Sequence, residues 1–78
     1  MFNVSIFVNA REASCKDKAC SVILPGREGT FEVLSHHKSI ASLLREGVII
    51  LDKKILPFLV KRGIAMMSQN ELVVLVET

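Results

Sequence analysis

The chain has 78 residues, 50% of them hydrophobic, and its 10 Lys and Arg residues against 8 Asp and Glu residues give a formal net charge of +2. This length suits one small domain, which we expect to span residues 1–78, and excludes two. The small, scattered charge argues against a surface that follows nucleic-acid phosphates, and no apolar run is long enough to cross a bilayer as a helix. The first residues lack the features of a secretory signal, so we expect Cys15 and Cys20 to be free thiols.

The first predicted strand covers residues 2–8. Its residues alternate between hydrophobic and polar, which is the period of a strand with one buried face, and Phe7 alone breaks the alternation. The polar and charged residues 11–18 follow, and we expect them to hold a turn and a short strand.

The next two predicted strands flank an exposed loop. The apolar residues 20–24 predict a strand, and Pro25-Gly26 is a typical turn pair that ends it. Gly29 allows a second sharp bend, and residues 30–34 predict the following strand.

Residues 35–46 fit a short helix by their periodicity. Ile40, Leu43 and Leu44 have helical spacing, Ser39 is a suitable N-cap, and Gly47 is a suitable end. The pattern alone therefore predicts a helix over residues 39–45.

The second half of the chain returns to strand signals. Residues 48–51 and 55–60 predict a hairpin around a turn at residues 52–54, and Pro57 requires its strand to lie at a sheet edge or to carry a bulge. Gly63 separates this hairpin from a strand over residues 64–67, and a turn at residues 68–70 leads to the last strand, residues 72–76. Many short strands with frequent turns predict an all-β fold, either a sandwich or a flattened barrel.

No group of residues predicts a catalytic or metal site. His36 and His37 are adjacent, and adjacent residues of an extended segment point to opposite faces, so they do not complete a zinc site with the two cysteines. Serines lie near the histidines in sequence, but a catalytic triad is assembled from distant parts of a fold. Residues 25–29 lack the lysine and the spacing of a phosphate-binding loop. We therefore expect no enzyme activity, no metal and no cofactor.

Residues 24–47 carry the most specific pattern in the chain. They read Leu-Pro-Gly-Arg-Glu-Gly, then an apolar strand, then Leu-Ser-His-His, and finally an apolar segment that ends in Leu-Arg-Glu-Gly. In order and spacing this closely resembles the signature of the epsilon subunit family of the F-type ATP synthase. The N-terminal strand, Gly63, and the last turn and strand also fit, so the resemblance covers essentially the whole chain.

The resemblance implies a small two-sheet β-sandwich, or flattened barrel, of about ten short strands with no helix of consequence. Residues 39–45 would then be extended. It also implies a rotor subunit of the central stalk, which couples the gamma subunit to the c-ring during proton-driven ATP synthesis without being catalytic. Such a subunit is peripheral to the membrane, at the cytoplasmic face of the bacterial inner membrane.

The same resemblance assigns two groups of surface residues. The group expected to face the c-ring consists of Arg27, Glu28, Gly29, Thr30 and Phe31. The group expected to face the gamma subunit consists of His37, Lys38, Ser39, Ile40 and Ser42.

Three positions depart from the family pattern. His36 stands where the family usually has glycine, so a positive φ there would strain it or reshape the turn. Glu32 replaces a small residue, and Gly63 stands alone where the family has a glycine pair. Family members also commonly continue into two C-terminal helices that this sequence does not contain, so we expect this chain not to inhibit ATP hydrolysis by extending them.

Two alternatives are compatible with the sequence. A free-standing β-barrel could bind a protein ligand or single-stranded nucleic acid, and the latter needs exposed aromatic residues on a basic face. A small enzyme could use His37 together with Cys20 or a nearby serine.

Overall fold

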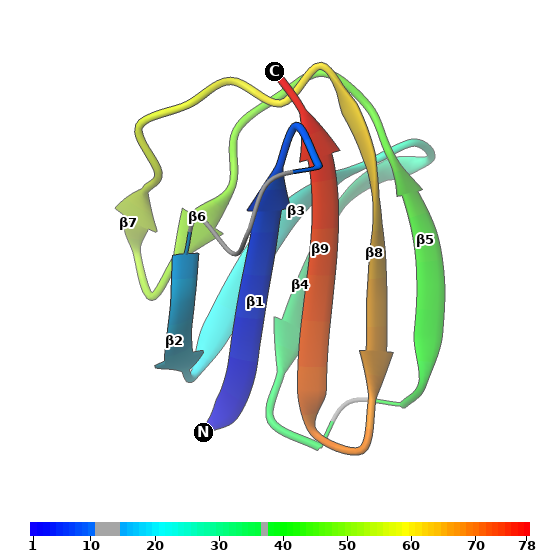
Figure 1. Ribbon diagram of the computed structural model, residues 1–78. Coiled ribbons are helices and arrows are strands. Elements are labelled where there is room, and N and C mark those ends of the chain that lie inside the picture. Colours follow the sequence, from blue (N-terminus) through cyan, green and yellow to red (C-terminus); the bar gives the residue numbers. More distant parts are fainter. Residues whose placement is uncertain (11–14, 37) are drawn as a thin grey trace.

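The computed structural model describes residues 1–10, 15–36 and 38–78. These residues form nine β-strands and no helix, so the predicted all-β fold is confirmed (Figure 1). No segment of the described ranges forms a helix that could span a bilayer. The strands are β1 (Phe2–Val8), β2 (Cys15–Ala19), β3 (Ser21–Gly26), β4 (Gly29–Leu34), β5 (Ile40–Leu44), β6 (Ile50–Leu51), β7 (Lys54–Ile55), β8 (Arg62–Ser68) and β9 (Glu71–Glu77).

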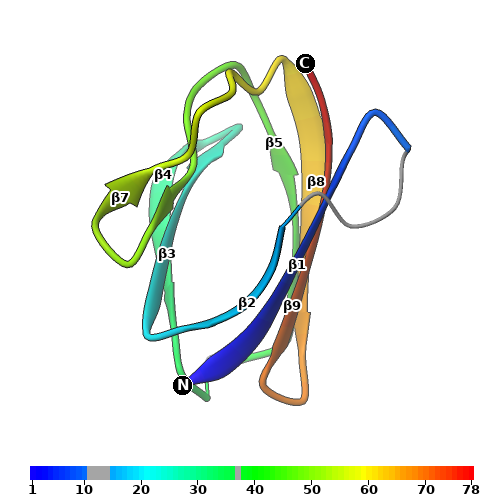
Figure 2. The same ribbon diagram turned by 60° about the vertical axis from the view of Figure 1, so that its left-hand side comes forward.

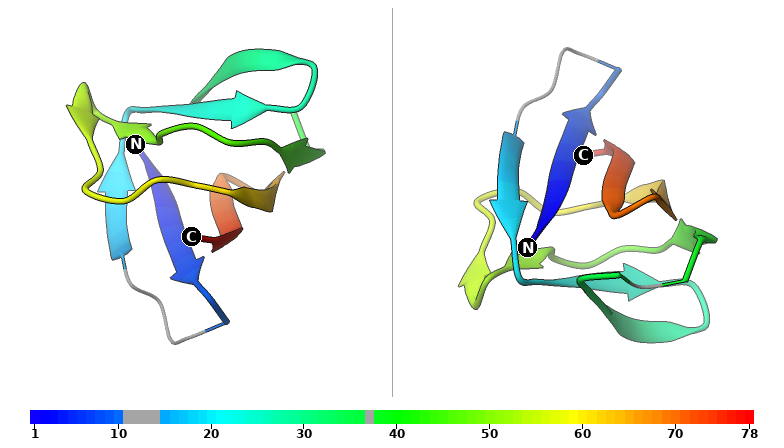
Figure 3. Two further views of the ribbon diagram at one scale, coloured as in Figure 1. Left: turned by 90° about the horizontal axis from the view of Figure 1, so that it is seen from above. Right: turned by 90° about the horizontal axis from the view of Figure 1, so that it is seen from below.

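The strands make two layers that face each other across the core (Figure 2). One layer has the order β2-β1-β9-β8-β5, and the other contains β4, β3, β6 and β7. Neighbouring strands are antiparallel except β1 and β9, which run parallel. The layers join where β5 meets β3, at the pair Gly26–Leu44, and Figure 3 shows the strands curling around the interior. The fold is therefore a two-sheet β-sandwich made from one curled sheet.

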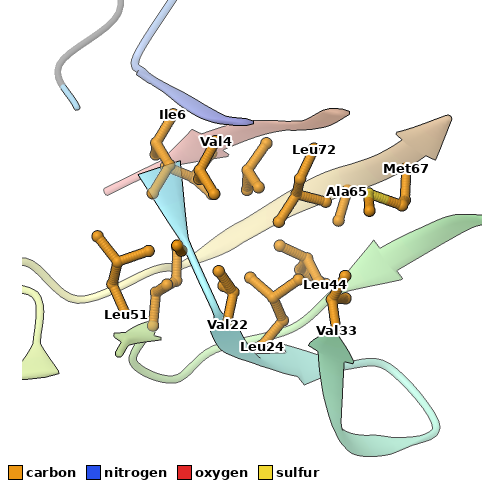
Figure 4. Packing of buried hydrophobic residues seen from close by; sticks show 14 of the residues in the cluster. Val4, Ile6, Val22, Leu24, Val33, Leu44, Leu51, Ala65, Met67 and Leu72 are labelled. Carbon is orange, nitrogen blue, oxygen red and sulfur yellow. The ribbon is translucent and has the colours of Figure 1, made fainter. Parts of the chain in front are cut away.

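The core lies between the layers and, over the described residues, contains no buried polar or charged side chain. In Figure 4 the buried side chains of β1, β8 and β9 face those of β3, β4, β5 and β6. Burying an aliphatic side chain of this size stabilises a fold by about 1.5–3 kcal/mol relative to leaving it in water. The buried hydrophobic residues are Phe2, Val4, Ile6, Ala19, Val22, Leu24, Val33, Leu44, Ile49, Leu51, Val60, Ala65, Met67, Leu72, Val74 and Val76.

The first predicted strand is confirmed as β1. Phe2, Val4 and Ile6 are buried, as their alternation predicted, whereas Phe7 is half-buried on the opposite face. The break in the alternation therefore marks an apolar residue on the outside of the sandwich.

The helix predicted from periodicity over residues 39–45 is wrong, and the extended segment implied by the family resemblance is confirmed. This part of the chain forms β5, which pairs with β8 through five residue pairs. Ile40 packs against the core and Leu44 is buried, whereas Leu43 is exposed on the other face. Both faces of the strand carry aliphatic residues, and this hides the period of two that would identify a strand.

The turn predicted at Pro25-Gly26 lies further along the chain. Both residues belong to β3, and residues 27–28 make the turn to β4, with Gly26 paired to Gly29. A Cβ atom on Gly26 would lie 2.5 Å from the carbonyl oxygen of Gly29 and 2.7 Å from the Phe31 ring. Gly26 is thus required for a close approach within the hairpin and not for a bend.

The hairpin predicted over residues 48–60 is shorter than expected. Only β6 and β7 pair, around a turn at residues 52–53. The N–H of Leu56 still donates to the carbonyl of Ile49 at 2.9 Å. Residues 57–59 then leave the ladder, because Pro57 has no N–H to donate, and Val60 pairs with Gly47. The strand predicted here, β7, lies at the edge of the sheet as expected, and Pro57 itself follows the strand.

Gly63 lies inside β8, so the prediction that it separates two strands is wrong. It pairs with Leu44 on one side and with Val76 on the other. A Cβ atom here would lie 2.3 Å from the carbonyl oxygen of Leu75 and 3.0 Å from a methyl carbon of Val76. A side chain at this position would therefore push β8 away from β9.

We predict that Gly63→Ala lowers the free energy of unfolding by about 1–3 kcal/mol, because the added methyl group overlaps backbone and not a movable side chain. Urea denaturation followed by circular dichroism measures the change. Ser68→Ala, an exposed position at the other end of β8, is the control and should change the stability by less than about 0.5 kcal/mol. A Gly63→Ala variant as stable as the wild type would contradict the close approach of β8 and β9.

Candidate docking surfaces

The residues predicted to face the c-ring lie on and beside the turn between β3 and β4, at the upper right of Figure 1. Arg27, Glu28 and Thr30 are exposed, Gly29 is partly exposed, and Phe31 packs against the core. The N–H of Arg27 donates to the carbonyl of Leu43 at 2.9 Å, which braces the turn against the end of β5. The hairpin therefore presents two charged side chains and one hydroxyl on a fixed backbone.

The residues predicted to face the gamma subunit begin at the opposite end of β5, at the bottom of Figure 1. His37 lies outside the described residues, and Lys38 and Ser39 are exposed between β4 and β5. Ile40 packs against the core, and Ser42 is half-buried on the same side of β5. Lys38 and Ser39 thus lie at the surface, whereas Ile40 and Ser42 lie on the inner side of the strand.

The two predicted groups meet at the upper part of β5. Residues 26–31 and 41–43 line one shallow depression between the β3–β4 turn and this strand. Ser42 therefore lies beside the residues predicted to face the c-ring, while Lys38 and Ser39 remain at the other end of β5.

An apolar patch lies on the outward face of β1, β9, β8 and β5, which no sequence motif indicated. Phe7, Leu75, Ile64 and Leu43 are neighbours in register across these four strands. Leu43 and Leu75 keep 51% and 41% of their surface exposed. In the next row, Met66 pairs with Val73 and is 38% exposed. We call this surface the outer apolar face, and it consists of Phe7, Leu43, Ile64, Met66, Val73 and Leu75.

Strands that are apolar on both sides are the signal that could have revealed the outer apolar face. In β9, Leu72, Val74 and Val76 are buried, and Val73 and Leu75 lie on the opposite side. An antiparallel sheet with one face in water normally carries polar residues on that face. Contiguous exposed apolar residues instead mark an interaction site.

Charged side chains border the outer apolar face at the end nearest Phe7, Leu75, Ile64 and Leu43. A shallow groove runs along it and is bordered by Arg27, Arg45, Lys61, Glu46 and Glu77. Arg62 pairs with Glu77 at 2.5 Å, but both side chains are mostly exposed, and such pairs add little stability. An apolar centre with a charged rim is the arrangement of a protein–protein interface.

The connection between β4 and β5 begins with a residue in the left-handed region. His36 has a φ of 59°, so the positive φ considered at this departure from the family pattern is confirmed. Its N–H donates to the Oδ1 atom of Asn70 at 2.8 Å. A non-glycine residue in this conformation costs about 1–2 kcal/mol, so the contact with Asn70 helps to hold a strained backbone.

Glu32, another departure from the family pattern, lies on the exposed side of β4. Its Oε2 atom accepts a hydrogen bond from the hydroxyl of Ser21 on the paired strand. The carboxylate is therefore not desolvated, and the fold accommodates it without a compensating charge.

The described residues hold no group of three or more His, Cys, Asp or Glu side chains that could bind a metal ion. Cys20 is exposed with a free thiol. The alternative catalytic pairing of His37 with Cys20 or a serine involves His37, which lies outside the described residues. Phe2 is buried, and Phe7, Phe31 and Phe58 are half-buried, so the described surface lacks the exposed aromatic platform that single-stranded nucleic acid needs.

Together these features define the class of the molecule: a small β-sandwich with an exposed apolar face and a braced charged turn. A family model described as ATP synthase, Delta/Epsilon chain, beta-sandwich domain matches residues 1–78, and the chain belongs to this family.

The curated relatives that match the chain are ATP synthase epsilon chains. The chain is 41% identical over 63 residues to the ATP synthase epsilon chain of Sulfurimonas denitrificans, and the match covers 77% of this chain and 48% of the relative. It is 37% identical over 62 residues to the plastid ATP synthase epsilon chain of Prototheca wickerhamii, covering 77% of this chain and 46% of the relative. The chain thus spans about half the length of the curated relatives it matches.

A solved structure shares the fold. The chain superposes with a TM-score of 0.77 on a chain from the central stalk/c-ring structure of the Tetrahymena thermophila mitochondrial ATP synthase. The match covers 97% of this chain and 63% of that chain at 12% identity, so it supports the fold alone.

We predict that His36→Gly raises the free energy of unfolding by about 0.5–1 kcal/mol, because relief of the left-handed strain outweighs the larger unfolded-state entropy of glycine. Urea denaturation measures the change. His36→Ala is the control, since alanine keeps the strain and should bring no gain. A glycine variant less stable than the wild type would show that the imidazole contributes more than its backbone strain costs.

Proposed function

We propose that this chain is the β-sandwich part of a rotor subunit in the central stalk of an F-type ATP synthase. In this role it couples the gamma subunit to the c-ring during proton-driven ATP synthesis. Membership of the delta/epsilon family and the likeness to a chain of a central stalk/c-ring structure support the proposal. The outer apolar face carries it, because a contiguous exposed apolar surface bordered by charged residues is typical of a protein–protein interface.

We assign the gamma subunit to the outer apolar face and to the neighbouring β4–β5 connection. Leu43 and Leu75 offer exposed apolar side chains, and Lys38 and Ser39 offer polar side chains at one end. Ile40 and Ser42 support this surface from the inner side of β5, and His37 keeps its assignment to the gamma side from the family pattern.

We assign the c-ring to the β3–β4 hairpin, with Arg27, Glu28 and Thr30 as the side chains that reach it. Gly29 and Phe31 shape the hairpin from within. Charged and hydroxyl groups on a turn suit a partner that presents polar loops, since electrostatic complementarity gives orientation and specificity.

The two proposed contacts are joined by backbone and not by flexible side chains. The pair Gly26–Leu44 and the hydrogen bond from the Arg27 N–H to the Leu43 carbonyl connect the turn to β5. Leu43 itself belongs to the outer apolar face. A close-packed interior deforms little. A force applied at the turn therefore reaches the outer apolar face with little change in the distance between the two surfaces.

In this role the domain is not catalytic and uses no cofactor or metal. It is peripheral to the membrane, at the cytoplasmic face of the bacterial inner membrane, and reaches the membrane through the complex. The chemistry belongs to other subunits, and the contribution of this chain is a rigid connection.

We predict that Leu43→Ser together with Leu75→Ser weakens binding to the gamma subunit of the same organism by tenfold or more. Each substitution removes apolar area from the interface, at a cost of about 1 kcal/mol or more. Co-purification and surface plasmon resonance with the immobilised gamma subunit measure the loss.

The matched control is Ile55→Ser together with Leu59→Ser. These residues are 66% and 58% exposed and lie outside the outer apolar face, so their replacement should leave the affinity within about twofold. Equal loss in both double variants would remove the assignment of the gamma subunit to the outer apolar face. No complex with the wild-type chain would contradict the proposed function itself.

We predict that Glu28→Ala together with Thr30→Ala leaves the affinity for the gamma subunit nearly unchanged but weakens assembly with the c-ring. Both side chains are exposed and outside the core, so the fold should lose less than about 0.5 kcal/mol of stability. Reconstituting membranes depleted of the native subunit and measuring ATP-driven proton pumping tests this. Full pumping by the double variant would contradict the role of the turn.

A further inference from the structure

Asn70 connects three segments that are far apart in the sequence. It lies in the turn between β8 and β9 with a φ of 59°. Its Nδ2 atom donates to the carbonyl of Met1 at 2.9 Å, and its Oδ1 atom accepts the N–H of His36 at 2.8 Å. Its own carbonyl accepts the N–H of Asn3 at 3.2 Å. One amide thus ties the start of β1 and the end of the β4 turn to the β8–β9 hairpin.

Both described ends of the β4–β5 connection are attached to this same hairpin. His36 is held by Asn70 in the turn, and Ile40 pairs with Met67 on β8. Lys38 lies two residues from each attachment point. Since one residue spans at most about 3.6 Å of chain, its Cα is confined to a small region near the β8–β9 turn.

The contact at His36 is the attachment that a side-chain substitution can remove more easily. A residue in the left-handed region persists when its surroundings hold it there, and the Asn70 amide supplies a hydrogen bond to the N–H of His36. The β8–β9 turn does not itself need this side chain, because glycine adopts a positive φ readily. Replacing Asn70 by glycine would therefore release His36 while keeping the turn.

We propose that Asn70 is a positioning residue for recognition of the gamma subunit. It holds His36, and through His36 it places the exposed residues Lys38 and Ser39 at the edge of the proposed interface. This inference rests on the proposed function, because it uses the same partner.

Asp52 provides a matched control within the same chain. It too lies in a turn with a positive φ, of 46°, and its carboxylate accepts the N–H groups of Cys20 and Ser21 at 2.8 and 3.0 Å. It belongs to the β6–β7 turn, outside both the β4–β5 connection and the outer apolar face. Asp52→Gly therefore removes two side-chain hydrogen bonds, as Asn70→Gly does, without releasing His36.

The experiment compares Asn70→Gly, Asn70→Asp and Asp52→Gly for binding to the immobilised gamma subunit, with urea denaturation of each variant alongside. Asn70→Gly should weaken binding by about fivefold, the effect of losing one net hydrogen bond of pre-organisation. Asp52→Gly should change the affinity by less than twofold at a comparable loss of stability. Asn70→Asp keeps the acceptor for the His36 N–H and should bind as the wild type does.

A second measurement is independent of any partner. Amide hydrogen exchange of the free chain should become faster at His36 in Asn70→Gly but not in Asp52→Gly. Wild-type affinity of Asn70→Gly, equal weakening by Asp52→Gly, or failure of Asn70→Asp to retain binding would each overturn the inference. Absence of binding by the wild-type chain would instead contradict the proposed function. In that case, an unchanged rate of amide exchange at His36 in Asn70→Gly would still reject the role of Asn70.

Discussion

The arrangement of the whole molecule depends on one narrow junction, where β3 meets β5 and the two layers become one sheet. A single residue pair, Gly26–Leu44, makes the connection. The N–H groups of Arg27 and Arg45 add hydrogen bonds of 2.9 Å to the carbonyls of Leu43 and Pro25. A Cβ atom on Gly26 would meet the carbonyl oxygen of Gly29 and the Phe31 ring, so its absence keeps the β3–β4 hairpin closed beside this junction. Both proposed contact surfaces are attached to this junction.

The outer apolar face links the stability of the domain to its assembly. A chain of 78 residues buries a modest fraction of its surface, and here some of its aliphatic residues lie outside the core, on the outward sides of β5, β8 and β9. Such a face leaves apolar area in water until another protein covers it. A partner that binds the folded state also stabilises it by mass action. A domain built in this way should therefore be more stable in its complex than alone.

The connections between strands are held by polar side chains that bind distant backbone. Asn70 holds His36 and the carbonyl of Met1, and Asp52 holds the N–H groups of Cys20 and Ser21. These contacts occur at turns with positive φ, where the backbone leaves the regular ladder. They give the connections defined positions in a fold whose described residues form no helix.

Local patterns in the chain were sufficient to predict the all-β class, β1 and β9, and the turn before β9, which covers residues 69–70 and not 68–70. In each case the alternation of burial or the turn chemistry is contained within a few neighbouring residues. The order of motifs between Leu24 and Gly47 was sufficient to predict the family and an exposed turn at Arg27 and Glu28. Neither required knowledge of which strands pair.

Tertiary structure alone decided the strand β5, the place of Gly63, the outer apolar face and the contacts of Asn70, because these features depend on pairing between distant residues. Ile40 to Leu44 have helical spacing and become a strand through β8, and Gly63 looks like a strand break until Leu75 is placed against it. The outer apolar face exists only when Phe7, Leu75, Ile64 and Leu43 come into register across four strands. Likewise, nothing near Asn70 in the sequence indicates that its amide reaches both Met1 and His36. A local pattern records which residues prefer burial, but the partner that buries them, or leaves them exposed, is chosen by contacts that span the whole chain.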